Sequence, residues 1–500
     1  MTAYAPSILW LRQDLRLVDN PALTAAAQRN RPILPLYVLD DETPAEWRLG
    51  GASRWWLHHS LTSLAASFET IGLPLILRRG PAAAVIIELS KETGADSVFW
   101  NRTYEPYAIA RDIALKRSLT ARGVSLACFN AALLHEPWTI KTKQGGPYKV
   151  FTPFWRALRR EPLAKPLPAP GLLPAPSVLP RSADLSEWSL LPTHPDWSQG
   201  LQESWTPGEA GAQRRLAAFL DESLACYRSD RDRPDRPTTA RLSPHLHWGE
   251  ISPRQIWHAV RMHAQRGRRA PADGAAEAFL RQLGWREFTH HLLYHWPDLP
   301  ARSWRSRFDA FSWRSDPVAL RAWQVGMTGY PIVDAGMREL WRTGWMHNRV
   351  RMIAASFLVK DLLIPWQTGE AWFWDTLVDA DLAQNAFSWQ WAAGAGVDAA
   401  PYFRIFNPVL QGRRFDPDGG YVRRWVPELA RLPNDFLHRP WTASSAVLES
   451  AGVVLGHDYP LPMVQHAAAR DRALAAFNSL PAAEDRLRFG VAAAAVEPPP

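Results

Sequence analysis

The segment from Asp379 to Trp391, DADLAQNAFSWQW, holds the residues whose types and spacing are best suited to chemistry. In a helix, Asp381, Asn385 and Trp389 follow one another at intervals of four and lie within about 40° of one stripe. One face would then offer a carboxylate, an amide and an indole in series, with Trp391 about 200° round the helix from Trp389. A capped helix with acidic residues at its start and Trp residues in the core shows the same spacing, so both interpretations stay open.

Two further segments carry groups suited to anions. The run WMHNRVRM puts Asn348 and Met352 on one helical face, while Arg349 and Arg351 diverge from each other. One arginine could face a buried anion and the other a nucleic-acid phosphate, although an ordinary basic surface turn looks the same. The segment at 239–243 follows a charged run and offers hydroxyl groups and backbone donors near a helix start, which suits a phosphate.

The elements that must position these groups begin with an α/β pattern over residues 1–135. The apolar runs SILWL, PILPLYVL, LPLILR, DSVFW and VSLACF alternate with helical stretches, which predicts a parallel, Rossmann-like sheet. Asn20 before Pro21 marks a helix start after the first run. No GxGxxG follows that run, so we expect a dinucleotide to bind elsewhere.

A connector is predicted at 136–205, and between Pro162 and Pro180 it holds prolines dense enough to favour an extended linker over a core element. Residues 206–480 show helical periodicity nearly throughout, which predicts an all-α domain. The end of the chain, 481–500, is expected to be a disordered tail.

Composition narrows the function classes. The chain has 57 Lys and Arg against 49 Asp and Glu, a net charge of +8 that suits a polyanionic partner. Two distant cysteines, Cys128 and Cys226, cannot form a disulfide framework, a zinc ribbon or a four-cysteine iron–sulfur cluster. His290, His291 and His295 are expected in the core or at the surface, not at a metal. With no apolar run of membrane length, we expect a cytoplasmic protein without a membrane role.

Seven motifs, in order along almost the whole chain, carry a resemblance to a known family. They are WLRQDLRLVDNPAL, TTARLSPHLHWGEISPR, LGWREF, TGYPIVDAGMREL, TGWMHNRVRM, DADLAQNAFSWQWAAG and DAAPYFRIFNP. Together they resemble the photolyase and cryptochrome family. The resemblance implies FAD in the helical domain, ultraviolet-damaged DNA as the partner, and a monomeric enzyme that splits cyclobutane pyrimidine dimers in light.

The resemblance also implies roles for particular residues. The FAD-binding positions are Tyr227, Thr239, Ala240, Arg241, Leu242, Ser243, Arg351, Asp379, Asp381 and Asn385, with Asn385 facing the flavin N5. An electron-transfer chain to the surface runs through Trp389, Trp366 and Trp313. Trp285 and Trp391 form the walls of the lesion cavity, with Asn348 and Met352 beside the dimer. The positions near the DNA strand are Arg231, Arg286, Arg349, Arg404 and Gln411.

Some positions refine what the resemblance implies. Dimer-repairing relatives commonly carry Glu three residues before Trp285, and this chain has Gln282, which keeps one acceptor but loses the charge. We therefore expect an effect on dimer affinity or efficiency without loss of repair. Asn348 stands where eukaryotic-type 6-4 enzymes use His, which favours the cyclobutane dimer. An antenna chromophore, folate or deazaflavin, would lie nearest Asn101 and Glu105. The alternative is a cryptochrome-type blue-light receptor that binds FAD without repairing DNA.

Overall fold

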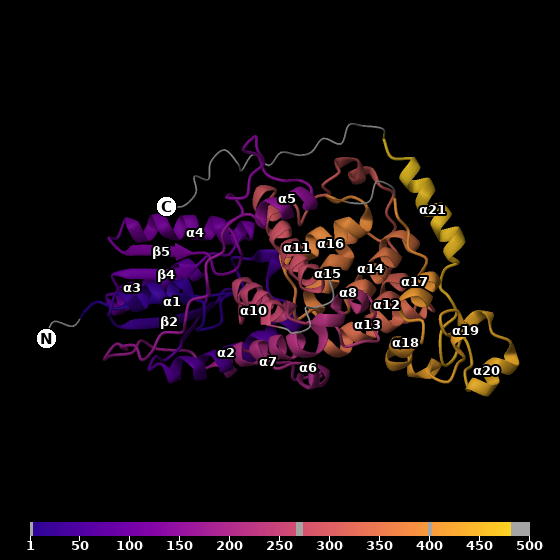
Figure 1. Ribbon diagram of the computed structural model, residues 1–500, viewed down its shortest axis with the longest axis horizontal. Helices are drawn as coiled ribbons and strands as arrows, with labels where there is room; N and C mark the ends of the chain where they lie inside the picture. Colours follow the sequence, from indigo (N-terminus) through magenta and orange to yellow (C-terminus); the bar gives the residue numbers. More distant parts are fainter. Residues whose placement is uncertain (1–3, 267–273, 399–402, 482–500) are drawn as a thin grey trace.

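The computed structural model describes residues 4–266, 274–398 and 403–481, so nearly all of the predicted tail lies outside the described residues. An α/β layer occupies one end of the molecule, and helices make up the rest (Figure 1). The predicted fold class, a parallel Rossmann-like sheet followed by an all-α domain, is confirmed. Among the described residues, no helix is long and apolar enough to cross a membrane.

The sheet has five parallel strands in the order β3-β2-β1-β4-β5. Each strand overlaps one of the apolar runs: β1 Ser7–Leu11, β2 Ile33–Leu39, β3 Ile76–Arg79, β4 Ser97–Asn101 and β5 Ser125–Phe129. β1 and β2 are buried along their whole length because helices cover both faces of the sheet, as parallel sheets require. α1 (Pro21–Gln28) and α2 (Gly51–Thr70) pack on one face, and α3 (Ala82–Thr93) and α4 (Pro106–Thr120) pack on the other.

The first strand-to-helix step follows the sequence signals. The Asn20 side chain accepts a hydrogen bond from the backbone N–H of Leu23 at 3.1 Å, and Pro21 takes the first helical position of α1. Because Pro21 has no N–H to leave unsatisfied there, cap and proline together fix where the helix begins.

The connector is anchored to the α/β layer. Its proline-rich part exchanges backbone hydrogen bonds with that layer: Asp19 donates to Leu167 at 2.9 Å, and Ile33 donates to Pro174 at 3.0 Å. The connector also contains α5 (Phe151–Leu158), which packs against α11 (Ala275–His295) of the helical domain. Prolines lack N–H donors but keep their carbonyl groups, so this segment can accept from the layer without joining the sheet.

The helical domain is built around α16 (Leu382–Ala393), which contacts α11, α14 (Asn348–Ser356) and α15 (Trp366–Thr376). Further helices around them are α7 Glu209–Ala218, α8 Tyr227–Asp230, α9 Ser243–His247, α10 Pro253–Arg266, α12 Pro317–Gln324, α13 Pro331–Thr343, α17 Pro408–Phe415, α18 Gly420–Trp425, α19 Asn434–Leu437, α20 Ser445–Ala451 and α21 His466–Asn478. Two hydrophobic clusters meet at α16: Trp389 belongs to one and Phe387 to the other. The helix is therefore held from both sides.

Buried carboxylates join the α/β layer to the helical domain. Glu250 accepts from the Trp56 indole at 3.0 Å and from the backbone N–H of Gly208 at 2.7 Å. Asp19 pairs with Arg254 at 2.9 Å. Glu287 accepts from the backbone N–H of Leu134 at 2.9 Å, and burial raises its pKa to about 7. Each carboxylate satisfies donors from the opposite part of the chain, so the two parts are fixed together.

Candidate functional site

The start of α16 forms a buried charged cluster. Asp381 caps the helix, with Oδ1 accepting from the backbone N–H of Gln384 at 2.9 Å. Its other oxygen, Oδ2, lies 3.4 Å from Nε2 of His290 and 3.9 Å from Nδ1 of His247. Burial acts to raise the pKa of Asp381, but the two histidines and Arg286 outweigh it and hold that pKa well below its usual range.

This arrangement favours the protonated form of His290. Its Nδ1 lies 3.0 Å from the carbonyl oxygen of Arg286, which only accepts hydrogen bonds, so Nδ1 carries a proton. Nε2 needs a second proton to face the Asp381 carboxylate favourably. Burial acts to lower the pKa of His290, but the Asp381 charge and hydrogen bond outweigh it and raise that pKa. The geometry favours an imidazolium–carboxylate pair, and no local pattern in the sequence indicates this role for His290.

A second ion pair lies just before α16. The Arg351 guanidinium, from α14, donates from Nη2 to both oxygens of Asp379, at 2.9 and 3.1 Å, and from Nε to the Met346 carbonyl at 2.7 Å. Asn385, one turn into α16, donates from its amide to the backbone carbonyl of Glu370 on α15 at 3.0 Å. The structure therefore brings an ion-paired guanidinium, two carboxylates and an amide together around the first turn of α16.

The segment at 239–243 lies between indole rings. Arg241 has a left-handed backbone with φ of +48°, and its guanidinium lies 4.6 Å from the ring centroids of both Trp205 and Trp345. Burial lowers its pKa, although Glu339 and Asp379 act to raise it. Ser243 begins α9 and accepts from the Trp345 indole at 3.4 Å.

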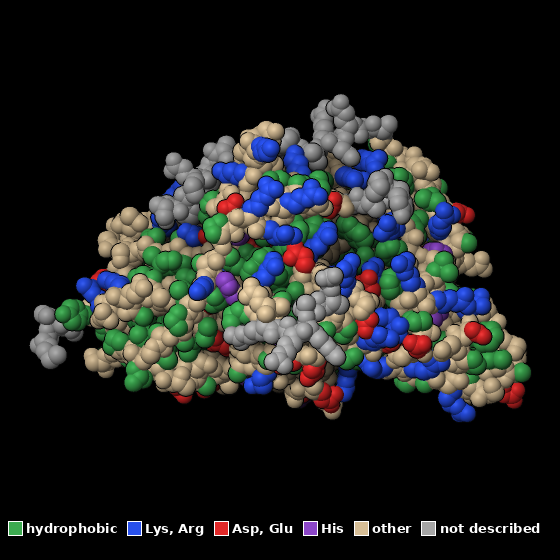
Figure 2. Space-filling view, viewed as in Figure 1, with side chains coloured by type: hydrophobic (Ala, Val, Ile, Leu, Met, Phe, Trp, Pro, Cys, Tyr) green, Lys and Arg blue, Asp and Glu red, His purple; other side chains and the backbone are tan. Residues whose placement is uncertain are grey.

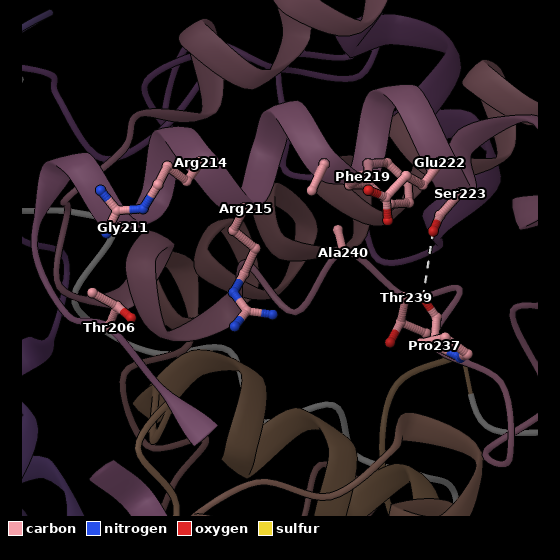
Figure 3. A pocket seen from close by; sticks show the side chains of 11 residues that line it. Thr206, Gly211, Arg214, Arg215, Phe219, Glu222, Ser223, Pro237, Thr239 and Ala240 are labelled. Carbon is pink, nitrogen blue, oxygen red and sulfur yellow. Dashed lines mark hydrogen bonds between the residues drawn. The ribbon is translucent and has the colours of Figure 1, made fainter. Parts of the chain in front are cut away.

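Thr239 and Ala240 line a pocket of about 350 Å³ beside α7 (Figure 3). Arg215 points into this pocket, where burial and the charge of Arg241 lower its pKa to about 10. The remaining predicted members are buried nearby in the core: Leu242, and Tyr227, whose ring packs edge-on against Phe279. Hydroxyl groups and guanidinium groups thus lie close together along this segment, and both can donate hydrogen bonds to a phosphate.

Several buried polar atoms along these elements lack a partner among the described residues. They include both ring nitrogens of His247, Nε of Arg241, Nε2 of His347 and Oε1 of Glu370. Buried polar groups are seldom left unpaired, so these atoms are suited to hydrogen bonds with a polar ligand. Carboxylates, amides and guanidinium groups match the hydrogen-bonding groups and the diphosphate of a dinucleotide such as FAD. The residues present therefore fit that cofactor.

The three tryptophans of the predicted electron-transfer chain occupy different depths. Trp389 and Trp366 are fully buried, and Trp313 is half-buried against Phe311 at a centroid distance of 4.4 Å. The Trp389 ring lies directly on α15 at Gly369, where an added Cβ would come within 2.2 Å of it. Trp366 begins the same helix, so α15 links the two inner rings. The depths fit a path from the interior towards the surface.

The predicted lesion walls, Trp285 on α11 and Trp391 on α16, are both half-buried. Gln282, also on α11, accepts a hydrogen bond at 3.2 Å from Arg231, the residue that follows α8. Arg349 pairs with Asp232 at 3.0 Å. The others take varied positions: Asn348 and Arg404 are exposed, and Met352 and Gln411 are half-buried.

Arg286 does not reach the surface, contrary to its predicted place near DNA. It is 6% exposed and donates from Nη1 to the Ala132 carbonyl at 2.6 Å. Its charge acts on the Asp381 cluster instead.

Figure 2 shows Lys and Arg side chains gathered over the middle of the viewed face, where α11 and α16 lie in Figure 1. Within the described ranges, no group of three or more His, Cys, Asp or Glu side chains is placed to hold a metal.

A parallel α/β layer joined to a helical domain with this polar cluster is the architecture of a two-domain flavoprotein. Residues 7–171 match the family model described as DNA photolyase, and residues 279–479 match the FAD binding domain of DNA photolyase. The chain therefore belongs to the DNA photolyase family.

Individual relatives agree with this placement. The chain is 53% identical over 478 residues to a deoxyribodipyrimidine photo-lyase of Agrobacterium fabrum, covering 95% of this chain and 98% of the relative. It is 40% identical to cryptochrome-1 of Arabidopsis thaliana, covering 92% of this chain and 68% of that protein. The structure superimposes on a bacterial class III photolyase from Agrobacterium tumefaciens with a TM-score of 0.92 and 51% identity, covering 96% of this chain and 98% of the other.

Proposed function

We propose that this protein is an FAD-dependent enzyme that uses light to split cyclobutane pyrimidine dimers in DNA. The observation that carries the proposal is the content of α16. This helix of 12 residues, with its cap, brings together the Asp381 carboxylate, the Asn385 amide, the innermost indole Trp389 and the half-buried Trp391. A cofactor site, an electron path and a lesion wall thus share one rigid element.

FAD would be held by the residues around the first turn of α16 and by the segment at 239–243. The carboxylates of Asp379 and Asp381 would accept hydrogen bonds from the flavin ring, and the hydrogen bonds from Arg351 hold the Asp379 carboxylate in place. Hydroxyl groups of Thr239 and Ser243 suit the diphosphate. When bound, FAD supplies the light-absorbing redox group, which in its reduced form lends the dimer one electron while two carbon–carbon bonds break.

The three indoles Trp389, Trp366 and Trp313 would carry electrons from the surface to the interior. Indole oxidation needs no titrating acid or base, so the site requires no general base. The surrounding aromatic rings Phe373 and Trp323 hold Trp389 in a dry position, at centroid distances of 4.9 and 6.2 Å. A rigid, water-free environment preserves the spacing between the rings.

The lesion would be bound between Trp285 on α11 and Trp391 on α16. A dimer must leave the duplex at a cost of a few kcal/mol, which the damage itself lowers. Stacking on Trp285 and Trp391 would offset this cost, since each stacked base contributes about 1–3 kcal/mol. Arg231, Arg349 and Arg404 would contact phosphates, so binding should fall with salt at a log–log slope of roughly −0.9 per contact.

We further propose that a folate or deazaflavin antenna binds at the carboxyl edge of β1 and β4, where the strand order reverses. Asn101 shapes this edge: its amide donates to Asp14 at 2.6 Å and to Asn20 at 2.7 Å. Glu105 precedes α4 at the same edge. We also propose that the protein acts as a monomer in the cytoplasm; the free thiols of Cys128 and Cys226 fit a reducing compartment. Sedimentation velocity tests the monomer.

The test of the main proposal incubates the reduced FAD-loaded protein with a thymine-dimer oligonucleotide under blue or near-ultraviolet light, with a dark control. We expect light-dependent loss of the dimer. A protein that binds and photoreduces FAD but leaves the dimer intact would instead be a cryptochrome-type receptor. Absence of flavin absorption in the purified protein would contradict both the photolyase and the cryptochrome-type receptor.

A further inference from the structure

The ring of Trp285 is backed by a residue outside the predicted site. Phe151, the first residue of α5, stacks on Trp285 with a centroid distance of 3.6 Å and an interplanar angle of 6°. Phe151 is 1% exposed, whereas Trp285 is half-buried. One face of the indole is therefore covered, and a stacking base can use only the other.

Phe151 is itself held on several sides. The Trp155 ring is stacked nearly parallel to it, and Phe288 meets it edge-on at 5.8 Å. The Arg281 guanidinium lies 5.2 Å from the Phe151 centroid. Trp155 packs directly on the backbone of α11, where a Cβ on Gly284 would come within 2.3 Å of its ring. The support behind Trp285 is thus fixed to the helix that carries Trp285.

A backbone contact completes the support. The Phe151 backbone N–H faces the Asp398 carboxylate: burial raises the pKa of Asp398, and this N–H acts to lower it. Asp398 closely follows α16, which carries the opposite wall, Trp391. The first residue of α5 therefore touches the segments that bear both walls.

We propose that Phe151 is a positioning residue for DNA lesions: it fixes the plane of Trp285 and leaves one indole face for the flipped base. This inference rests on the proposed function, because it needs Trp285 as a lesion wall. It makes the connector between the two domains part of the substrate site.

The experiment compares Phe151→Leu with Phe154→Leu in the FAD-loaded protein. Both residues lie on α5 and are 1% exposed, but Phe154 packs on Phe288 and His291 and has no ring contact with Trp285. Affinities for a thymine-dimer oligonucleotide and for its undamaged counterpart are measured in the dark. We expect F151L to bind the dimer about tenfold more weakly, a loss within the range of one stacked base, with undamaged binding unchanged. F154L should keep the wild-type ratio between the two oligonucleotides.

Trp285→Leu separates the two levels of the proposal. If W285L weakens dimer binding while F151L matches F154L, the role of Phe151 is overturned and the proposed function stands. If W285L leaves dimer binding unchanged, the lesion wall is wrong, and the role of Phe151 falls with it. Flavin content reports folding, and Phe151→Met, which keeps bulk without a plane, carries the same expectation if F151L loses FAD.

Discussion

Removing the charge of Asp381 while keeping its cap tests the cluster at the start of α16. Asn is as good a helix cap as Asp, so Asp381→Asn keeps an acceptor for the Gln384 N–H and removes the partner of His290. Two unit charges 3.4 Å apart attract by about 5 kcal/mol at an effective dielectric constant of about 20. The cost of burying both charged groups offsets part of this attraction. We therefore expect D381N to lower the free energy of unfolding by about 3 kcal/mol near pH 6.

The loss should depend on pH in a direction set by His290. Its pKa is raised above the ordinary 6.5 in the folded protein, so its contribution is fully present below pH 6.5 and disappears as pH rises through the folded value. The pKa of Asp381 is lowered, so its contribution persists above its ordinary 3.8 and is lost only in strong acid. In D381N, burial leaves His290 neutral. The difference in free energy of unfolding between wild type and D381N should therefore become smaller as the pH rises from 6.5 into the alkaline range.

The assay is urea unfolding followed by helical circular dichroism, with FAD in equal excess throughout. A double-mutant cycle with His290→Gln isolates the coupling between the two side chains from any effect of D381N on cofactor binding. The coupling should be about 3 kcal/mol near pH 6 and smaller at alkaline pH. A coupling that is the same at every pH would refute the protonated state of His290.

Three further expectations follow from the site. Trp389→Phe should strongly slow photoreduction of oxidised flavin but spare repair by chemically reduced enzyme. Trp323 is also fully buried, so Trp323→Phe serves as the control and should only lower the free energy of unfolding, by about 1–2 kcal/mol. Equal rates of photoreduction in both variants would remove Trp389 from the electron-transfer chain. Gln282→Glu should bind dimer DNA about fivefold more tightly, because a carboxylate acceptor strengthens a hydrogen bond by about 1 kcal/mol, and filter binding with dimer and undamaged oligonucleotides checks this. Asp379→Asn should weaken FAD binding about thirtyfold by leaving Arg351 without its charge partner, and fluorescence titration with FAD that shows no change would place the cofactor elsewhere.

Local patterns in the sequence were enough for the fold class. The apolar runs mark β1, β2 and β4 because these strands are buried throughout and must be apolar on both faces. Asn20 with Pro21 marks a helix start by its own chemistry. The capped helix at Asp381 was also readable, because a cap needs only its own first turn. These features depend on neighbours in sequence.

Contacts between distant segments could not be read in the same way. The proline-rich part of the connector has no periodicity, and the partners that anchor it, such as Ile33, lie far back in the chain. The family resemblance implied a position near the DNA strand for Arg286, but its side chain enters the interior and donates to the Ala132 carbonyl. The stack of Phe151 on Trp285 joins two segments that share no motif.

The carboxylates between the two domains bear on how the chain can be divided. A fragment starting near residue 206 would keep Glu250 but lose the Trp56 indole that donates to it, and would keep Glu287 without the Leu134 N–H. Either cut removes these hydrogen bonds and exposes the buried interface around them to water, so each fragment loses contacts that the whole chain makes. Neither part can be exchanged for that of a distant relative unless both sides of these contacts are carried over together.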